Sequence, residues 1–522
     1  MTATGPASDA APAEAVSEAE PRAAVIGRPW PLNSWDSAIL GSIALVAFLV
    51  RLIPVLRGGG LGGYGRYDDG VYYAAADSLI HGRAPYRSFV LLHPPGLPLL
   101  LSPFAELGRF TSDAIGFEVA RIAFMGVGAL NAVLVAALAR RWGRAAALVS
   151  GGIYAVWWAA VYTEESTVLE PLGTTALLVA LALLLKRTHP PSRRAELIAG
   201  AALGAAATLK IWYLGPWLAI CLWQLAARRW RSTAHLVAAG TTAVLVVVLP
   251  FFFLAPTRMF NMVVRDQLLR PSLPGSSRSN RLQFIFSIRQ LLPGSIHISV
   301  ATATKLFLVL VVMAIIGCLL DVSSRVLIYV FLVNLGILIL SPSFFGHYAH
   351  LATAPTALVL GVGGSQLVGR VRFDALQAAI VVLVAALCSY SAYRVFQIHV
   401  DRPVAASKLA DAAPPGCVAS DNPELLILMN KLSSDLSAGC PVAVDVSGVT
   451  YDFAHRTLAN GRPVPRYRNP AWNQYLYGYL TSARSFVFVR PEAGVSAATL
   501  RRITARPALA TSDGVDLRAG GP

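Results

Sequence analysis

The chain has 522 residues, of which 55% are hydrophobic and 14% are charged, and its formal net charge is +16. Soluble domains carry about 25% charged residues, so this composition excludes an ordinary soluble protein and indicates an integral membrane protein. The positive charge does not indicate nucleic-acid binding, because the arginines cluster between apolar runs, where the positive-inside rule accounts for them. The five cysteines form no CxxC pair, so neither a zinc site nor a redox pair is expected.

Residues 1–33 hold few large apolar side chains, which predicts a disordered cytoplasmic tail. Residues 34–398 form the predicted membrane domain, because apolar runs long enough to cross a bilayer recur there. The runs predict about eleven transmembrane helices, at 36–56, 116–139, 145–162, 168–185, 195–211, 213–227, 234–254, 300–320, 325–341, 350–368 and 374–396. The stretch 92–108 is too short and rich in proline, so we expect a juxtamembrane or re-entrant segment there.

Basic clusters follow every second predicted helix, and the positive-inside rule then predicts that these loops are cytoplasmic. The clusters lie at 140–144, 186–194, 228–231, Arg325 and 370–372. The N-terminus is then cytoplasmic as well. The loops 57–115, 163–167, 255–299 and 342–349, together with everything after Arg394, are predicted to lie outside a multi-pass cell-membrane protein.

Residues 399–522 differ in kind, because charges return and the apolar runs shorten. We expect a small extracytoplasmic α/β domain here, with strands at Cys440–Val446 and Ser485–Val489 and helices at Asn469–Leu480 and Val495–Thr504. A Cys417–Cys440 disulfide would suit the oxidising outer side. The alternative is two unpaired cysteines. The predicted fold class is thus an all-α polytopic membrane protein with juxtamembrane helices in its first outer loop and a small C-terminal α/β domain.

The most informative stretch is Tyr-Asp-Asp-Gly at 67–70, just after the first predicted span. Two adjacent carboxylates, Asp68 and Asp69, are costly to desolvate and repel each other. One of them can accept a proton from an attacking hydroxyl while the other orients the reactants. Gly70 would allow close approach of the backbone to a ligand. The alternative is that the acids only cap a helix at 70–80.

Further motifs follow in order: Leu-His-Pro-Pro-Gly at 92–96, Ala120-Arg121 at the start of a span, and Leu-Ala-Arg-Arg-Trp-Gly at 138–143. As a set, over residues 36–250, they resemble the integral-membrane glycosyltransferases of the GT-C fold, such as protein O-mannosyltransferases and the lipid A aminoarabinose transferase. The resemblance implies transfer of a sugar from a polyprenyl-phosphate carrier to an acceptor on the outer side. It also implies that Asp68 is the general base and that Asp69 supports it. Gly70 departs from the pattern, since many relatives have a larger residue there.

Other residues at the predicted outer ends of spans are candidates for substrate binding. Glu170-Pro171 resembles a second acidic motif of these enzymes, and Glu165 lies close to it in the same loop; favourable placement at a helix N-terminus is the other explanation for Glu170. Lys210 resembles a lysine of the relatives, or snorkels to the interface. His347 resembles a His-Tyr position, or is structural. His93 either contacts the acceptor or holds a short helix.

The outer loop 255–299 carries six arginines, against the positive-inside rule: Arg258, Arg265, Arg270, Arg278, Arg281 and Arg289. Arginine is suited to binding a phosphate leaving group. Arg278 and Arg281 are the preferred ligands, because Gly275, Ser276 and Ser277 would let that stretch close over a donor. The alternative is attraction of the loop to anionic lipid head groups.

These features predict a hexosyl- or pentosyltransferase that uses a polyprenyl-phosphate sugar and a glycan, lipid or protein acceptor, embedded in membrane lipid and without nucleic acid. No cofactor is expected. A divalent metal is not favoured, because few outer carboxylates lie near Asp68 in the sequence. The alternative is a transporter or lipid flippase, which predicts ionisable residues near the centres of spans, where they are scarce. An inactive relative with a scaffold domain would lack Asp68.

Overall fold

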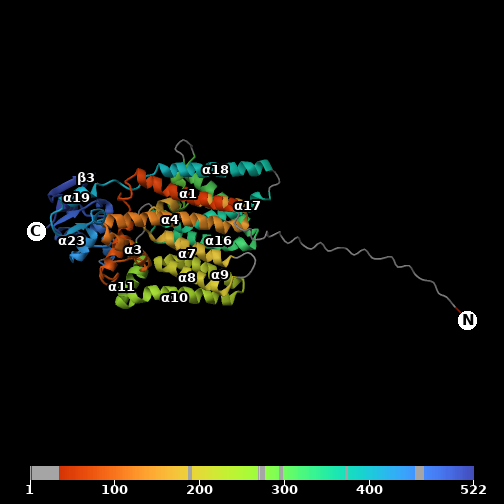
Figure 1. Ribbon diagram of the computed structural model, residues 1–522, viewed down its shortest axis with the longest axis horizontal. Helices are drawn as coiled ribbons and strands as arrows, with labels where there is room; N and C mark the ends of the chain where they lie inside the picture. Colours follow the sequence, from red (N-terminus) through yellow and green to blue (C-terminus); the bar gives the residue numbers. More distant parts are fainter. Residues whose placement is uncertain are drawn as a thin grey trace.

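The computed structural model describes residue 2 and residues 34–185, 191–268, 270, 277–292, 298–370, 374–452 and 464–521. The expected tail at 1–33, apart from residue 2, lies outside these residues, as do Gly275 and Ser276. Figure 1 shows a bundle of long helices with a small domain at one end, beside α3 and α11. The described chain therefore has the helical membrane bundle and the C-terminal α/β domain that the composition predicts.

The membrane bundle is built from helices whose apolar sequences match the predicted spans. Their bounds are α1 Ser34–Arg57, α4 Asp113–Ala139, α5 Arg144–Val156, α6 Trp158–Glu164, α7 Leu169–Leu184, α8 Arg193–Leu209, α9 Leu214–Ala226, α10 Trp230–Leu254, α15 Val300–Leu319, α16 Arg325–Leu340, α17 Thr353–Val368 and α18 Asp374–Phe396. Among the described residues, seven helices are long and apolar enough to cross a membrane, and the pair α5–α6, bent by 56°, makes up to eight. The segments Leu169–Leu184 and Ile211–Ala226 are shorter apolar helices. The chain is a multi-pass membrane protein, and the count of eleven crossings and the orientation stay predictions.

Small residues bring several of these helices into close contact. A Cβ added at Gly204 on α8 would lie 2.2 Å from the backbone oxygen of Gly240 on α10. A Cβ at Gly317 on α15 would likewise lie 2.1 Å from the oxygen of Gly363 on α17. Helices in lipid gain stability from such backbone contact, because burial against another helix offers no hydrophobic gain over burial in lipid. A side chain at either crossing would force the helices apart.

A buried polar cluster joins α1, α4, α6 and the 3₁₀ helix η5 (Gly346–Ala352) inside the bundle. The Nε of Arg51 donates to Glu164 at 2.9 Å, Asn131 donates to the other oxygen of Glu164 at 2.9 Å, and His350 lies 3.0 Å from the same oxygen. Tyr154 also donates to Glu164 at 2.6 Å. The Glu164 charge is thus paired and hydrogen-bonded, which is the condition for burying a carboxylate. The cluster fixes η5 against α6.

The first outer loop contains the two juxtamembrane helices that the sequence predicts, α2 (Tyr67–Ile80) and α3 (Gly96–Phe110). Most of α2 is buried, although its sequence is not continuously apolar. On α3, Leu100 and Phe110 are exposed, as expected of an amphipathic helix at a membrane surface. Short helical segments lie between α10 and α15: α11 Pro256–Phe260, the π-helix η3 Asn261–Arg265, α12 Asp266–Leu268, α13 Arg278–Ile285 and α14 Ile288–Leu291.

The C-terminal domain, from residue 399, packs several short helices around a four-stranded sheet. The helices are α19 Ala406–Ala412, α20 Pro423–Leu428, α21 Leu432–Ser437, α22 Val449–Asp452, α23 Pro470–Ser482 and α24 Ala497–Thr504, and the strands are β1 Val418–Ser420, β2 Ser485–Val487, β3 Ala508–Ser512 and β4 Val515–Ala519. The strand order is β1-β2-β4-β3, with β1 parallel to β2 and the other pairs antiparallel. Ala419 pairs with Phe486, and Phe486 pairs with Arg518. Cys417 and Cys440 form a disulfide.

One predicted strand, Cys440–Val446, is wrong, since this segment has no regular structure. Its apolar side chains do not alternate between a buried and an exposed face. Val444 enters the core shared with α2, whereas Ala443 and Val446 enter the core under the sheet. Pro441 also lacks the backbone N–H that a strand ladder needs. The other predicted elements correspond to β2, α23 and α24.

The C-terminal domain touches the membrane bundle at a pair of buried acids. Ser433 of α21 lies 3.0 Å from Asp77 on α2 and 2.5 Å from Asp113 at the start of α4. Burial raises the pKa of Asp77 from 3.8 to about 7, the Asp113 charge adds to this rise, and Ser433 opposes it. His81 lies 3.4 Å from Asp77. The folded protein therefore holds a proton on Asp77 at a pH where the unfolded chain does not.

The expected consequence is a fall in stability as the pH rises from 3.8 to about 7, between the pKa of Asp77 in the unfolded chain and its raised pKa in the folded protein. In this window the unfolded chain has released the proton that the folded protein retains, so stability falls with rising pH; above the folded pKa both states are ionised and the effect is constant. Asp77→Asn cannot ionise, so the difference in unfolding free energy between the wild type and this variant should change by about 1.4 kcal/mol per pH unit between about pH 4 and about pH 7. Unfolding in detergent, followed from about pH 4 to about pH 8, measures this. Equal pH dependence in the two proteins would contradict the assignment.

Candidate functional site

Asp68 is the second residue of α2, a helix that packs against α20 of the C-terminal domain. Its side chain is 42% exposed, whereas that of Asp69 is fully buried. The ionisable partner recorded for Asp68 in the described structure is His347, whose Nε2 lies 3.8 Å from Oδ2. The two adjacent acids therefore have different environments, and only Asp68 is open to a reactant.

A second acid, Glu170 at the start of α7, lies close to Asp68 through a shared neighbour. His347 Nε2 is 4.0 Å from Glu170 Oε1 and so stands between the two carboxylates. Lys210, between α8 and the 3₁₀ helix Ile211–Tyr213, donates to the same Oε1 at 2.6 Å. The other oxygen, Oε2, is buried without a hydrogen-bond partner among the described residues. A buried carboxylate oxygen that lacks a protein donor is suited to accepting one from a ligand.

Lys210 lies against two aromatic rings, and a second cation, Arg270, contacts one of them. Lys210 Nζ lies 3.5 Å from the centre of the Tyr348 ring and 4.3 Å from that of Trp212. Arg270 donates to the hydroxyl of Tyr348 at 2.9 Å. Lys210 and Arg270 therefore both contact Tyr348 beside Glu170. Together they supply the positive charge that an anionic ligand such as a phosphate would need.

His93 faces the same cations from the segment before α3. It is buried, and its ring centre lies 6.0 Å from that of Tyr72 on α2. Burial, followed by the charges of Lys210 and Arg270, lowers the pKa of His93 well below its usual value. This histidine is neutral at physiological pH, so it can offer a hydrogen bond near the cations without adding to their charge.

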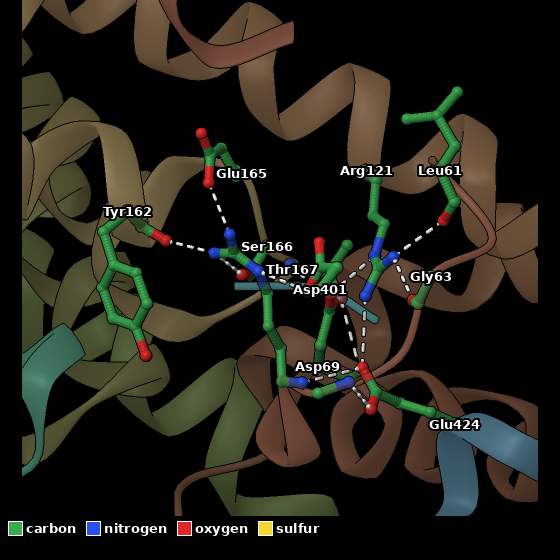
Figure 2. A network of polar contacts seen from close by, with 12 residues as sticks. Leu61, Gly63, Asp69, Arg121, Tyr162, Glu165, Ser166, Thr167, Asp401 and Glu424 are labelled. Carbon is green, nitrogen blue, oxygen red and sulfur yellow. Dashed lines mark hydrogen bonds and ion pairs between the residues drawn. The ribbon is translucent and has the colours of Figure 1, made fainter. Parts of the chain in front are cut away.

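Asp69 belongs to a separate, buried network drawn in Figure 2. Its Oδ2 accepts from Arg121 Nε at 2.8 Å, and its Oδ1 accepts from the backbone and the hydroxyl of Thr167. Arg121 also donates to the backbone oxygens of Leu61 and Gly63 and to Glu424 of the C-terminal domain. Asp69 therefore holds the loop in shape and does not face the open side of Asp68.

Arg66 supplies the second guanidinium of this network, and it forms an ion pair with Glu165. It donates to Glu165 at 2.5 Å, to Asp401 at 2.9 Å, and to Ser166 at 2.9 Å. Burial raises the pKa of Glu165 to about 7, although Arg66 opposes this rise. Burial likewise raises the pKa of Glu424 to about 7, with Arg121 opposing. Four acids share the network with two arginines: Asp69, Glu165, Asp401 and Glu424 with Arg66 and Arg121.

The remaining two sequence candidates, Arg278 and Arg281, lie at the start of α13. Arg278 is exposed. Arg281 is buried and donates to the backbone oxygens of Leu338, Ile339, Ser341 and Pro342, at the end of α16. A cation at a helix C-terminus satisfies carbonyls that the helix leaves unpaired. The recorded contacts of Arg281 thus give it a role in capping α16.

The fold therefore brings together Asp68, Glu170, Lys210 and His347, with His93 beside them, and assigns Asp69 and Glu165 to the buried network. Sequence reasoning did not select Arg270, because nothing in the composition of the outer loop separates it from five other arginines. It did not assign a role to Arg121 or Glu424 either. In the described residues, no group of three or more His, Cys, Asp or Glu side chains is placed to hold a metal ion.

Comparisons with known proteins show what the fold of this chain resembles. The model of Glycosyltransferase family 87 matches residues 91–342. The fold resembles ArnT from Cupriavidus metallidurans bound to undecaprenyl phosphate, with 16% identity, a TM-score of 0.57, and coverage of 94% of this chain and 99% of that chain. It also resembles the oligosaccharyltransferase AglB from Archaeoglobus fulgidus in complex with an inhibitory peptide and a dolichol-phosphate, with 13% identity, a TM-score of 0.54, and coverage of 87% and 69%. A search of curated protein sequences finds no match.

Proposed function

This chain has the GT-C fold of integral-membrane glycosyltransferases, and from that premise we propose that it moves a sugar from a polyprenyl-phosphate carrier to an acceptor hydroxyl. The observation that carries the proposal is the convergence of an open carboxylate, Asp68, with the Glu170–Lys210 pair and Arg270. Asp68 supplies a base, and the two cations supply a phosphate site beside it. Both parts are needed for transfer from a sugar phosphate.

In the proposed reaction, Asp68 takes the proton of the acceptor hydroxyl as that oxygen attacks the anomeric carbon. The bond between the anomeric carbon and the phosphate oxygen breaks, and its electron pair stays on the phosphate. Lys210 and Arg270 stabilise the negative charge that develops there, which is the largest contribution that a preorganised site can make. A single displacement inverts the configuration at the anomeric carbon.

Glu170 and His347 would orient the sugar in this scheme. The unpaired Oε2 of Glu170 can accept a hydrogen bond from a sugar hydroxyl, and the adjacent Oε1 is held by Lys210. His347 stands 3.8 Å from Asp68 and 4.0 Å from Glu170, so it can contact both the base and the sugar-binding acid. His93, neutral and buried beside them, is proposed to contact the acceptor.

The proposed location of the reaction is the outer side of the cell membrane, with the N-terminus in the cytoplasm. This orientation rests on the alternation of basic loops along the chain. The Cys417–Cys440 disulfide supports it, because disulfides persist in oxidising compartments. The donor is then membrane-embedded through its polyprenyl chain, and the acceptor is a glycan, a lipid or a protein at the membrane surface.

The test of this proposal is sugar transfer by the purified protein in liposomes, supplied with a panel of radiolabelled polyprenyl-phosphate hexoses and pentoses and with membrane extract as acceptor. Radioactivity that moves into an acceptor, with release of the polyprenyl phosphate, supports a transferase and identifies the sugar class. Movement of the intact donor between leaflets without transfer would support a flippase. If the protein neither transfers nor moves any donor, the proposal fails.

Arg270→Gln is expected to lower kcat/KM for the donor by about 10- to 100-fold, because a charge-assisted hydrogen bond contributes about 1.5–3 kcal/mol and this cation acts on charge that develops in the transition state. Initial rates at varied donor concentration measure this effect. Arg278→Gln is the matched comparison, since Arg278 lies in the same loop and was one of the two arginines that the sequence favoured. Its exposed position predicts a smaller effect. A larger fall in kcat/KM for Arg278→Gln than for Arg270→Gln would indicate that Arg278 binds the phosphate.

A further inference from the structure

The C-terminal domain reaches the loop that carries Asp68 through the start of helix α20. A Cβ added at Gly70 would lie 2.6 Å from both the backbone nitrogen and the Cγ of Glu424. No side chain fits in that space, because real Cβ atoms do not approach a backbone atom so closely. Gly70 is the position at which this chain departs from the larger residue of many GT-C enzymes. The departure is explained here by the packing of α20 against α2, two residues after Asp68.

Glu424 holds the backbone that leads to Asp68. Its Oε2 accepts from the amide of Gly65 at 2.9 Å and from Asn422 Nδ2 at 3.1 Å. Its Oε1 accepts from the amide of Arg66 at 3.3 Å and from Arg121 Nη2 at 3.1 Å. Four donors thus converge on one carboxylate, and two of them are consecutive backbone amides just before α2. These bonds fix the direction in which the chain enters the helix.

The Glu424 carboxylate is also linked, through Arg121, to the residue after Asp68. Arg121, which donates to Glu424, donates to Asp69 at 2.8 Å. Figure 2 shows Glu424 beside the ribbon of the C-terminal domain, with the guanidinium of Arg121 pointing towards it. Glu424 and Asp69 are fully buried, whereas Asp68 is open. Glu424 therefore touches no reactant, but it constrains the main chain on both sides of Asp68.

We propose that Glu424 of the C-terminal domain is a positioning residue for Asp68, with Gly70 as the close contact that lets α20 reach it. The C-terminal domain is then part of the catalytic unit rather than an appended module. This inference rests on the proposed transferase function. A displacement of about 1 Å at a reacting group costs about 10²-fold in rate, so loosening this contact lowers the rate without removing any group that binds the substrates.

The test compares Glu424→Gln with the wild type in the full-length protein. Glutamine has the same size, but its amide nitrogen would take the place of an oxygen that accepts from two donors, so two of the four hydrogen bonds are lost. We expect kcat for sugar transfer to fall by about 10²-fold, with donor and acceptor KM changed by less than about threefold. Hydrogen–deuterium exchange should become faster at the amides of residues 64–69.

Gly70→Ala is the second variant, because it pushes α20 away from α2 while leaving Glu424 intact. We expect the same fall in kcat and the same faster exchange, and the double variant should be no worse than the single ones, since both break one contact. Asp435→Asn is the control for a buried acid of the C-terminal domain outside this contact; it accepts from the amide of Val418. It should lower the melting temperature without changing kcat or the exchange at 64–69.

Two results would overturn the inference. One is unchanged exchange at residues 64–69 with unchanged kcat in Glu424→Gln. The other is an equal loss of kcat in Asp435→Asn, which would indicate general destabilisation. If the wild type transfers no sugar from any donor, the proposed function fails by itself. Faster exchange at residues 64–69 in Glu424→Gln would in that case still support positioning of the loop by Glu424, and unchanged exchange would overturn it.

Discussion

Asp68→Asn should lower kcat for sugar transfer by about 10³-fold, the range that a general base contributes. The asparagine amide oxygen can accept a hydrogen bond but is too weakly basic to take the proton of the acceptor hydroxyl, so the attacking oxygen stays protonated. The fold should be unaffected, because Asp68 is 42% exposed and its recorded partner, His347, is 3.8 Å away. We therefore expect a melting temperature within about 2 °C of the wild type, as for other exposed substitutions. Transfer at saturating donor and acceptor measures the loss.

The neighbouring variant Asp69→Asn is the control, since it makes the same chemical change one residue later. Asp69 is paired with Arg121 and bound by Thr167, so this variant should lose stability together with activity. Asp68→Asn that transfers sugar as well as the wild type would exclude Asp68 as the base. Asp68→Asn that unfolds would place Asp68 in the buried network instead.

Arg121→Gln should destabilise the protein by about 3–5 kcal/mol, the cost of breaking a buried ion pair by removing one partner. Arg121 is fully buried, and its loss leaves Asp69 and Glu424 without their cation and the backbone oxygens of Leu61 and Gly63 without a donor. Unfolding in mixed micelles of mild detergent and SDS measures the change.

Arg325→Gln is the matched control for Arg121→Gln. Arg325 begins α16 and is exposed, and its recorded contact is a 3.4 Å bond to the backbone oxygen of Leu319. Its replacement should change the unfolding free energy by less than about 0.5 kcal/mol. An equally small change in Arg121→Gln would mean that the network of Figure 2 contributes little to stability, and the role assigned to Glu424 would lose its support.

The fold class could be predicted from the sequence, because apolar length alone identifies helices that cross a membrane. Much of the candidate site could also be predicted. Glu170, Lys210 and His347 each stand near an end of an apolar run, Asp68 lies in the loop after the first run, and the alternation of basic loops assigns all four to one side. Polar residues at the same depth and on the same side of a bundle can differ in position only within the plane of the membrane. The fold brings these four together.

The buried network could not be predicted in the same way. Arg121 and Glu424 are 303 residues apart in the chain. No local sequence pattern indicates that a helix of the membrane bundle contacts the start of α20 in the C-terminal domain. The contacts of the individual outer-loop arginines could not be predicted for a related reason. Arg270 and Arg281 lie in the same loop, but Arg270 reaches Tyr348 and Arg281 caps α16. Only the path of the chain distinguishes them.

The contact between the C-terminal domain and the helix that carries Asp68 could not be predicted for the same reason. Gly70 could be read from the sequence only as a flexible residue beside two acids. Its neighbour in space is Glu424, and the 2.6 Å approach of that residue is set by where α20 begins. A glycine beside two acids can thus mark a contact with a distant element, and the sequence alone gives the position without the partner.

The most direct test of the central claim is the anomeric configuration of the product, determined by NMR after transfer from a polyprenyl-phosphate sugar of known configuration. One displacement with Asp68 as base predicts that every product sugar has the configuration opposite to that of the donor. Retention of configuration would contradict this mechanism, because it requires two successive displacements and a covalent intermediate on the enzyme.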